Sequence, residues 1–422
     1  MKPLLFRSPA YWPAIAMLAL NFGLMIFVPP RSLHAEENSA AQASNAFAFD
    51  ALNAMKTGAA KDGNIAFSPF SLWSALTMTS GGAAGDTLKE MRQTLHETSI
   101  ADIHARAASL TTRLQATPGA ELRVANRLFG APGFMTTPSF DALMQKQYLA
   151  EMERVPFATD KAAACQHINK WVAAQTANRI PNLLNDRDIT PDMKLVLINA
   201  VYFKAAWETE FRPESTVPLP FHRADGTTLL SPMMFGKSEI PYYDGEGFKA
   251  VRLMYKGGKA SLIVLLPDSD SGTCSRTKTQ ATAPAIDAVL FKKIRTNLKP
   301  QKVVLRLPRF KAEQRLDFVP ILKSLGMNLP FSDNKADFSA LSTQVELKIS
   351  VVIHQAMVQV GEKGTEAAAA TAVFMAPRGM PPRDVEKPKE FIADHPFYFF
   401  ITHEETGAIL FLGKVDLPES KK

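Results

Sequence analysis

A run of small residues near the C-terminus constrains the fold of this chain most strongly. Residues 364–372 are glycine, alanine and threonine apart from Glu366, and they continue a stretch, 347–360, that is typical of a long β-strand. Consecutive alanines also favour a short helix or a flexible linker. In an extended chain, one face of the run would carry only small or branched side chains: Thr365, Ala367, Ala369, Thr371 and Val373. That face could be buried in a sheet, while Glu366 on the opposite face would stay in solvent.

The placement of proline supports an extended conformation. No proline occurs between residues 362 and 376, so every residue there can donate to a sheet ladder, and the first proline is Pro377. The segment is therefore predicted to be able to join a sheet as a strand that stops near Pro377.

The rest of the chain is typical of a globular α+β protein. Of the 422 residues, 46% are hydrophobic and 21% are charged, which excludes a disordered or fibrous protein. No repeat marks a second domain, so we predict one domain over residues 46–418. Helices are predicted at 71–80 and 86–95, and strands at 122–129, 195–203, 262–266, 303–310, 347–360, 397–402 and 408–415. This order predicts large mixed or antiparallel sheets surrounded by helices, with residues 362–388 as an exposed loop between strands.

The N-terminus has the features of an export signal. Lys2 and Arg7 precede an apolar run, 14–28, and the small residue Ala35 could precede a cleavage site. We therefore expect residues 1–35 to be a signal peptide, residues 36–45 to be a polar linker, and the protein to be exported. Contact with a membrane is expected only if the signal stays uncleaved as an anchor.

Other classes of chemistry find no support in the sequence. The formal net charge of +7 falls to +4 without the first 35 residues, and no Lys/Arg block suggests a nucleic-acid partner. Two cysteines, Cys165 and Cys274, cannot supply a disulfide framework or a cysteine zinc site. Hydrolase, metalloprotease and phosphate-loop spacings are absent, so we predict neither an enzyme nor a metal or cofactor site. The charged stretch 403–405 is interpreted as a solvated tip beside the turn of a hairpin.

The small-residue run closely resembles the hinge of inhibitory serpins. The matching residues, which we call the hinge, are Glu362, Gly364, Thr365, Glu366, Ala367, Ala368, Ala369, Ala370 and Thr371. The resemblance covers almost the whole mature chain, because further blocks resemble serpin landmarks in the family's order: 64–71, 125–129, 199–207, 232–234 and 393–413. The resemblance implies the serpin fold, a monomer and a single-use inhibitor of serine proteases.

Membership of this family would imply a specific mechanism. A target protease cleaves the reactive loop and forms an acyl-enzyme, and the freed loop inserts into the main sheet as a new strand. The native fold would then be held kinetically rather than at its free-energy minimum. The partner would be a serine protease trapped in a covalent complex.

The position of the reactive bond follows from the resemblance. In inhibitory serpins the bait is usually the seventeenth residue counted from the hinge glutamate, which is Arg378 here, followed by Gly379. Arginine fits the Asp-bottomed specificity pocket of trypsin-like proteases, and the sequence around Arg378 also suits thrombin-like ones. Arg383 is the competing bait residue.

The resemblance also assigns structural roles outside the loop. Ser68, Ser71, Asn199 and His354 match a polar cluster that gates opening of the sheet, and Trp207 matches an aromatic residue where the loop enters. His354 could equally be a satisfied core histidine. Two alternatives to the main interpretation stay open: a non-inhibitory serpin acting as carrier or chaperone, and a cross-class inhibitor of cysteine proteases.

Overall fold

The structure is a computed structural model that describes residues 33–57, 63–97, 102–185, 187–268, 284–365 and 387–420. The predicted signal segment up to residue 32, Cys274, and the loop residues 366–386 lie outside the described residues. That range includes the hinge from Glu366 onward, Arg378, Gly379 and Arg383. None of the described helices combines the length and apolar character needed to cross a bilayer.

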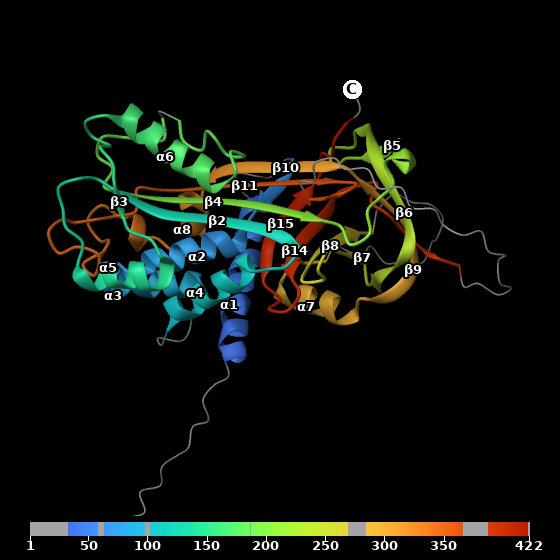
Figure 1. Ribbon diagram of the computed structural model, residues 1–422, viewed down its shortest axis with the longest axis horizontal. Coiled ribbons are helices and arrows are strands. Elements are labelled where there is room, and N and C mark those ends of the chain that lie inside the picture. The colour runs from blue at the N-terminus through green and yellow to red at the C-terminus, as the bar shows by residue number, and fades with distance from the viewer. Residues whose placement is uncertain are drawn as a thin grey trace, which may run out of the picture.

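The described residues form an α+β fold with two large sheets, which confirms the predicted fold class (Figure 1). The α-helices are α1 (Leu33–Thr57), α2 (Pro69–Ser80), α3 (Gly85–Thr94), α4 (Ile103–Gln115), α5 (Pro138–Leu143), α6 (Lys161–Gln175), α7 (Ala288–Asn297) and α8 (Val319–Ser324). The strands are β1 (Ile65–Phe67), β2 (Ala120–Gly130), β3 (Glu153–Arg154), β4 (Leu195–Ala206), β5 (Val217–His222), β6 (Thr228–Gly245), β7 (Phe248–Met254), β8 (Ala260–Pro267), β9 (Lys299–Pro308), β10 (Phe310–Asp317), β11 (Val351–Gly361), β12 (Gly364–Thr365), β13 (Lys389–Ile392), β14 (Phe397–His403) and β15 (Ile409–Val415).

The six-stranded sheet runs in the order β10-β11-β12-β4-β2-β3. The helix α6 covers one of its faces and α2 lies against the other (Figure 1). Strand β4 is apolar along nearly its whole length, as expected for a strand covered on both faces. Helix α2 is buried at every position, and Ser68 caps it by accepting a hydrogen bond from the amide of Ser71.

The nine-stranded sheet includes the C-terminal hairpin of β14 and β15 and has the order β1-β15-β14-β8-β7-β6-β9-β13, with β5 beside β6. The predicted hairpin of β14 and β15 is confirmed. Strand β13, which follows the loop predicted over residues 362–388, pairs in parallel with β9. The loop is therefore attached to a different sheet at each end.

Several predicted boundaries were wrong. The expected polar linker over residues 36–45 belongs to α1, and Ala40, Ala41 and Ala43 are buried in the core. Small alanine side chains let this helix pack closely, so the folded part begins before residue 46. The stretch 303–310 is divided at Arg309 into β9 and β10.

The strand predicted over 347–360 starts only at Val351. Leu347 and Ile349 are buried, but the Ile349 amide donates to the carbonyl of Pro330 rather than to a neighbouring strand. The alternating apolar residues before Val351 are thus buried as predicted, but they are not part of a strand.

The predicted solvated tip at 403–405 was also wrong in part. His403 is buried and contacts Thr406, and Glu404 forms an ion pair with Arg252 at 2.9 Å. Glu405 alone remains half exposed.

Candidate functional site

The first residues of the predicted reactive loop (362–388), which we call the loop root, are Glu362 to Thr365, and they lie at the end of β11 and between β11 and β4. The chain turns after β11, and the two residues of β12 pair on one side with β11, where Thr365 is opposite Val360. On the other side Thr365 is opposite Ala205 of β4. Farther along the sheet, β11 and β4 pair directly and in parallel, from Val351 opposite Val196 to Ala356 opposite Val201. The first two hinge residues after the turn therefore already occupy a place between these strands.

Gly364 is required by this close approach. Its φ of +146° is a conformation that side chains disfavour, and a Cβ there would lie 2.1 Å from the carbonyl oxygen of Ala205. A larger residue would push the hinge away from β4.

Aromatic residues hold the turn before β12. The indole Nε1 of Trp207 donates to the carbonyl of Gly361 at 2.8 Å, and its backbone amide donates to the carbonyl of Lys363 at 2.9 Å. The Trp207 ring stacks on Tyr255 with ring centroids 4.6 Å apart. The hydroxyl of Tyr255 lies 2.6 Å from the hydroxyl of Thr365.

Glu362 is fixed by an ion pair and a hydrogen bond. Its carboxylate accepts from Nε of Arg309 at 2.7 Å and from the hydroxyl of Thr216 at 2.7 Å. Burial alone would raise the pKa of Glu362, but the bonds from Arg309 and Thr216 outweigh burial and lower it. The hinge glutamate is therefore charged and tied to the start of β10 and of β5.

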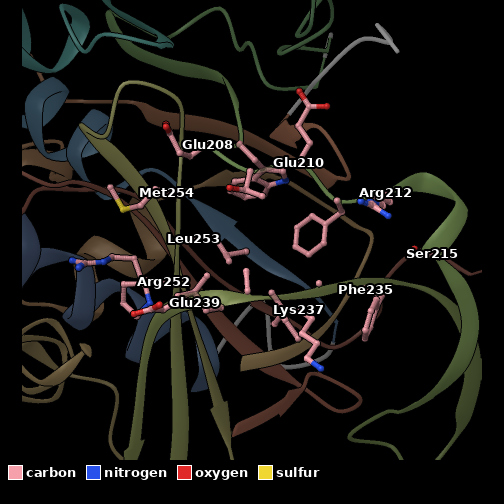
Figure 2. A pocket seen from close by; sticks show the side chains of 18 residues that line it. Glu208, Glu210, Arg212, Ser215, Phe235, Lys237, Glu239, Arg252, Leu253 and Met254 are labelled. Atoms are coloured by element: carbon pink, nitrogen blue, oxygen red, sulfur yellow. The ribbon is translucent and has the colours of Figure 1, made fainter. Parts of the chain in front are cut away.

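A cavity of about 520 Å³ lies beside this root and is lined by Trp207 and the residues that follow it. In Figure 2, Leu253 and Phe235 lie on opposite sides of the cavity and Glu210 points away from both. The amide of Phe211, another lining residue, donates to the carbonyl of Glu362 at 2.9 Å. The same short segment thus forms a wall of the cavity and holds the loop root.

The predicted polar cluster is present beneath the direct pairing of β11 and β4. Ser68, Ser71, Asn199 and His354 are each at most 1% exposed. The Asn199 amide donates to the Ser71 hydroxyl at 2.6 Å, and its carbonyl oxygen contacts Nδ1 of His354. The Ser68 amide donates to Nε2 of His354 at 3.0 Å. These bonds connect both strands to the start of α2.

His354 is uncharged in this environment. Burial lowers its pKa to about 3, and a protonated Nε2 could not accept the bond from the Ser68 amide. The interpretation as a satisfied core histidine and the interpretation as a link between strands therefore describe the same contacts.

His395 anchors the chain on the other side of the loop, where β13 leads into β14. Its Nδ1 lies 2.7 Å from the Asp394 carboxylate and its Nε2 lies 2.7 Å from the carbonyl oxygen of Pro267. Burial alone would lower the pKa of His395, but Asp394, the Pro267 carbonyl and the charge of Asp268 outweigh burial and raise it. Both ring nitrogens can donate only in the protonated form.

This geometry predicts a pH dependence of stability. Because the folded pKa of His395 is raised, its contribution is complete below the ordinary value of 6.5 and is lost as the pH rises through the folded pKa. The pKa of His354 is lowered, so its contribution to stability changes with pH in the opposite direction. The effect of His395 should therefore be measured as the difference in the free energy of unfolding between the wild-type protein and His395→Gln. Urea unfolding should give a difference of roughly 1.5–3 kcal/mol at pH 6 that shrinks by pH 9. A difference that is constant with pH would contradict a charged His395.

Sequence reasoning missed four residues of the site. Arg309 and Thr216 both contact Glu362, Tyr255 contacts Thr365, and Asn126 contacts Asn199. Asn126 lies in a block that had been matched to the family, whereas Arg309 and Tyr255 carried no local signal. Within the described residues, no group of three histidine, cysteine or acidic side chains could hold a metal ion.

Comparison with known proteins agrees with this architecture. The family model described as Serpin (serine protease inhibitor) matches residues 42–418. Leukocyte elastase inhibitor A of Mus musculus is 38% identical over 359 residues, which are 84% of this chain and 93% of that protein. Serpin B8 of Homo sapiens is 38% identical over 366 residues, with the same two coverages.

Solved structures lead to the same conclusion. The crystal structure of Serpin48 from the insect Tenebrio molitor matches with a TM-score of 0.76 at 29% identity, covering 90% of this chain and 98% of that chain. The matching family is described as serine protease inhibitors, and the mouse and human relatives are named as an inhibitor and a serpin, which confirms the prediction that this chain is not an enzyme. The chain belongs to the serpin family of serine protease inhibitors.

Proposed function

We propose that the protein is an irreversible inhibitor of trypsin-like serine proteases, which cleave it after Arg378 and are trapped when the loop inserts between β11 and β4. The observation that carries this proposal is the position of β12 between β11 and β4. Its two residues pair with both strands at the end of the six-stranded sheet where the loop begins. Insertion would extend a strand that has already begun.

The register of β12 indicates where each further loop residue would go. Each further residue of the loop would pair one residue earlier on β11 and on β4. Glu366 would therefore lie between Gln359, which is exposed, and Lys204, which is half-buried. Ala367 would meet Val358 and Phe203, which are at most 1% exposed. The small face of the hinge thus coincides with the buried face of the sheet.

The same register gives the polar cluster a role in timing. Thr371 would lie between His354 and Asn199, whose side chains contact each other in the structure. Insertion must therefore separate β11 from β4 and break this contact. We propose that the cluster contributes to the kinetic barrier that keeps the uncleaved loop out.

The register also gives an estimate of the free energy that insertion would release. Strand β4 starts at Leu195, which would be opposite Met375, two residues before Pro377. About ten further residues would gain ladder bonds of roughly 0.5–1.5 kcal/mol net each, or on the order of 10 kcal/mol in total.

The class of target follows from Arg378 rather than from the relatives. Relatives named leukocyte elastase inhibitors refer in their names to a different protease. Trypsin-like proteases have an aspartate at the bottom of the specificity pocket, and the planar guanidinium of arginine can form two hydrogen bonds with its carboxylate. This pairing selects arginine over uncharged residues. We therefore propose an Arg-specific target, with thrombin-like proteases included.

We also propose that the protein is exported and that residues 1–35 are its cleaved signal. The support is the basic start and the apolar run 14–28 in the sequence. N-terminal sequencing of protein recovered outside the cytoplasm should begin at Glu36. Recovery of the chain with residues 1–35 still attached in the membrane fraction would contradict this proposal.

Cleavage itself tests the insertion mechanism. Brief treatment with a metalloprotease, which forms no acyl-enzyme and so cannot be trapped, should nick the reactive loop and raise the melting temperature, on the order of 20 °C for a gain near 10 kcal/mol. Calorimetry of the nicked and intact protein measures the change. A nicked protein that melts at or below the intact one would mean that the loop does not insert.

A further inference from the structure

The contact between Tyr255 and Thr365 joins the two sheets at the loop root. Tyr255 follows β7 of the nine-stranded sheet, and Thr365 is the second residue of β12 in the six-stranded sheet. Both are fully buried, and their hydroxyl oxygens are 2.6 Å apart. The hinge is thus bonded through a side chain to a part of the molecule outside the sheet it enters.

Backbone and ring contacts fix the position of Tyr255. Its amide donates to the carbonyl of Ala260 at 3.0 Å, and an isolated bridge joins it to Trp207. Its ring stacks on Trp207 at an interplanar angle of 9° and meets the edge of Phe203 with centroids 5.4 Å apart. The phenol therefore cannot follow Thr365 if the hinge leaves the sheet.

Departure of the hinge would leave a buried hydroxyl without its observed partner. A buried polar group that loses its hydrogen bond is costly, because the surroundings cannot replace the bond. Burial also raises the pKa of Tyr255, although the Thr365 bond opposes this, so the phenol stays a neutral donor or acceptor. The pair consequently favours the conformation in which Thr365 is seated.

We propose that Tyr255 is a positioning residue for loop insertion: its hydroxyl keeps Thr365 seated between β11 and β4 before cleavage, so that insertion starts from a pair that is already formed. This inference rests on the proposed inhibitory function. Starting a strand is the slow part of such a process, because chain entropy is lost before neighbouring bonds form.

The starting point matters because insertion competes with hydrolysis. Attack of the protease serine on the Arg378 carbonyl releases the amine of Gly379 and leaves an ester between Arg378 and the serine. Water can then add to that ester, which gives the Arg378 carboxylate and restores the serine hydroxyl of an active protease. The fraction of molecules that trap the protease is set by how fast insertion occurs relative to this hydrolysis.

The experiment compares Tyr255→Phe with the wild-type protein and with Tyr242→Phe, a matched change at another buried tyrosine of the same sheet, on β6. Hydrogen exchange of the uncleaved proteins is followed by mass spectrometry over residues 361–366. Titration of trypsin gives the number of inhibitor molecules consumed per protease inactivated.

For Tyr255→Phe we expect hydrogen exchange at the hinge to become about five-fold faster, because one hydrogen bond is lost. For the same reason the number of inhibitor molecules consumed per trypsin inactivated should rise about two- to five-fold. Tyr242→Phe should match the wild type in both measurements. Thr365→Val removes the other hydroxyl and should reproduce both effects, and the double variant should add nothing further. Thr365→Val also covers the case in which Tyr255→Phe fails to fold.

The outcomes separate the two proposals. A wild-type protein that is cleaved without inactivating trypsin would refute the inhibitory function. If the wild type inhibits but Tyr255→Phe and Thr365→Val leave the number consumed unchanged or lower it, the positioning role of Tyr255 is wrong. That holds whether or not hinge exchange becomes faster.

Discussion

Replacing Arg378 with alanine is expected to slow the inactivation of trypsin by roughly 10³-fold or more. The specificity pocket of such a protease is built around a buried aspartate, and a bait residue without a cation leaves that charge unpaired. The measurement is the second-order rate constant from progress curves with trypsin in the presence of a chromogenic substrate.

Arg383→Ala is the matched control for this prediction, because it removes the neighbouring arginine from the same loop. We expect its rate constant to equal that of the wild type. The reverse pattern, in which Arg383→Ala abolishes inactivation and Arg378→Ala does not, would move the reactive bond by five residues.

Replacing Ala367 with aspartate, which adds no site for trypsin, is expected to convert the inhibitor into a substrate. On the register of β12, residue 367 would be buried beside Val358 and Phe203, where an unpaired carboxylate would cost several kcal/mol. Trypsin should still cleave after Arg378 but should be released active, with the number consumed per protease rising by more than about 100-fold.

Glu366→Asp provides the control for Ala367→Asp. It introduces the same side chain one residue earlier, where the register predicts a place beside exposed Gln359. Its number consumed should stay within about two-fold of the wild type. Equal losses in both variants would mean that insertion does not follow the observed register.

The reactive loop was the part of the protein most open to prediction from sequence. Its small-residue face and the absence of proline up to Pro377 are local properties, and strand pairing depends on them directly. The seat of Thr365 between β11 and β4 agrees with that face, because its pairing partners Val360 and Ala205 are also buried.

The contacts that hold the loop root could not be predicted in this way. Arg309 precedes Glu362 by 53 residues and Tyr255 precedes Thr365 by 110. Each pair meets only because two sheets converge at this point, and neither arginine nor tyrosine has a pattern in its own neighbourhood that indicates a partner. Such contacts depend on the tertiary arrangement alone.

Composition misled the prediction at the N-terminus. Residues 36–45 are rich in alanine, serine and asparagine, which is typical of a linker, but alanine is also the best helix former. The helix exists because Ala40, Ala41 and Ala43 pack into the core beside residues far along the chain. Asn45 shows the same dependence, since its side chain donates to the carbonyl of Gly407 at 2.9 Å.

The measurement that tests the central claim most directly is denaturing gel electrophoresis of the full chain mixed with excess trypsin, with mass spectrometry of the released peptide. The proposed mechanism predicts a protease-inhibitor complex that survives denaturation, together with a C-terminal peptide that begins at Gly379. Cleavage after Arg378 without such a complex, and with trypsin still active, would contradict the account and indicate a serpin that does not inhibit this class of protease.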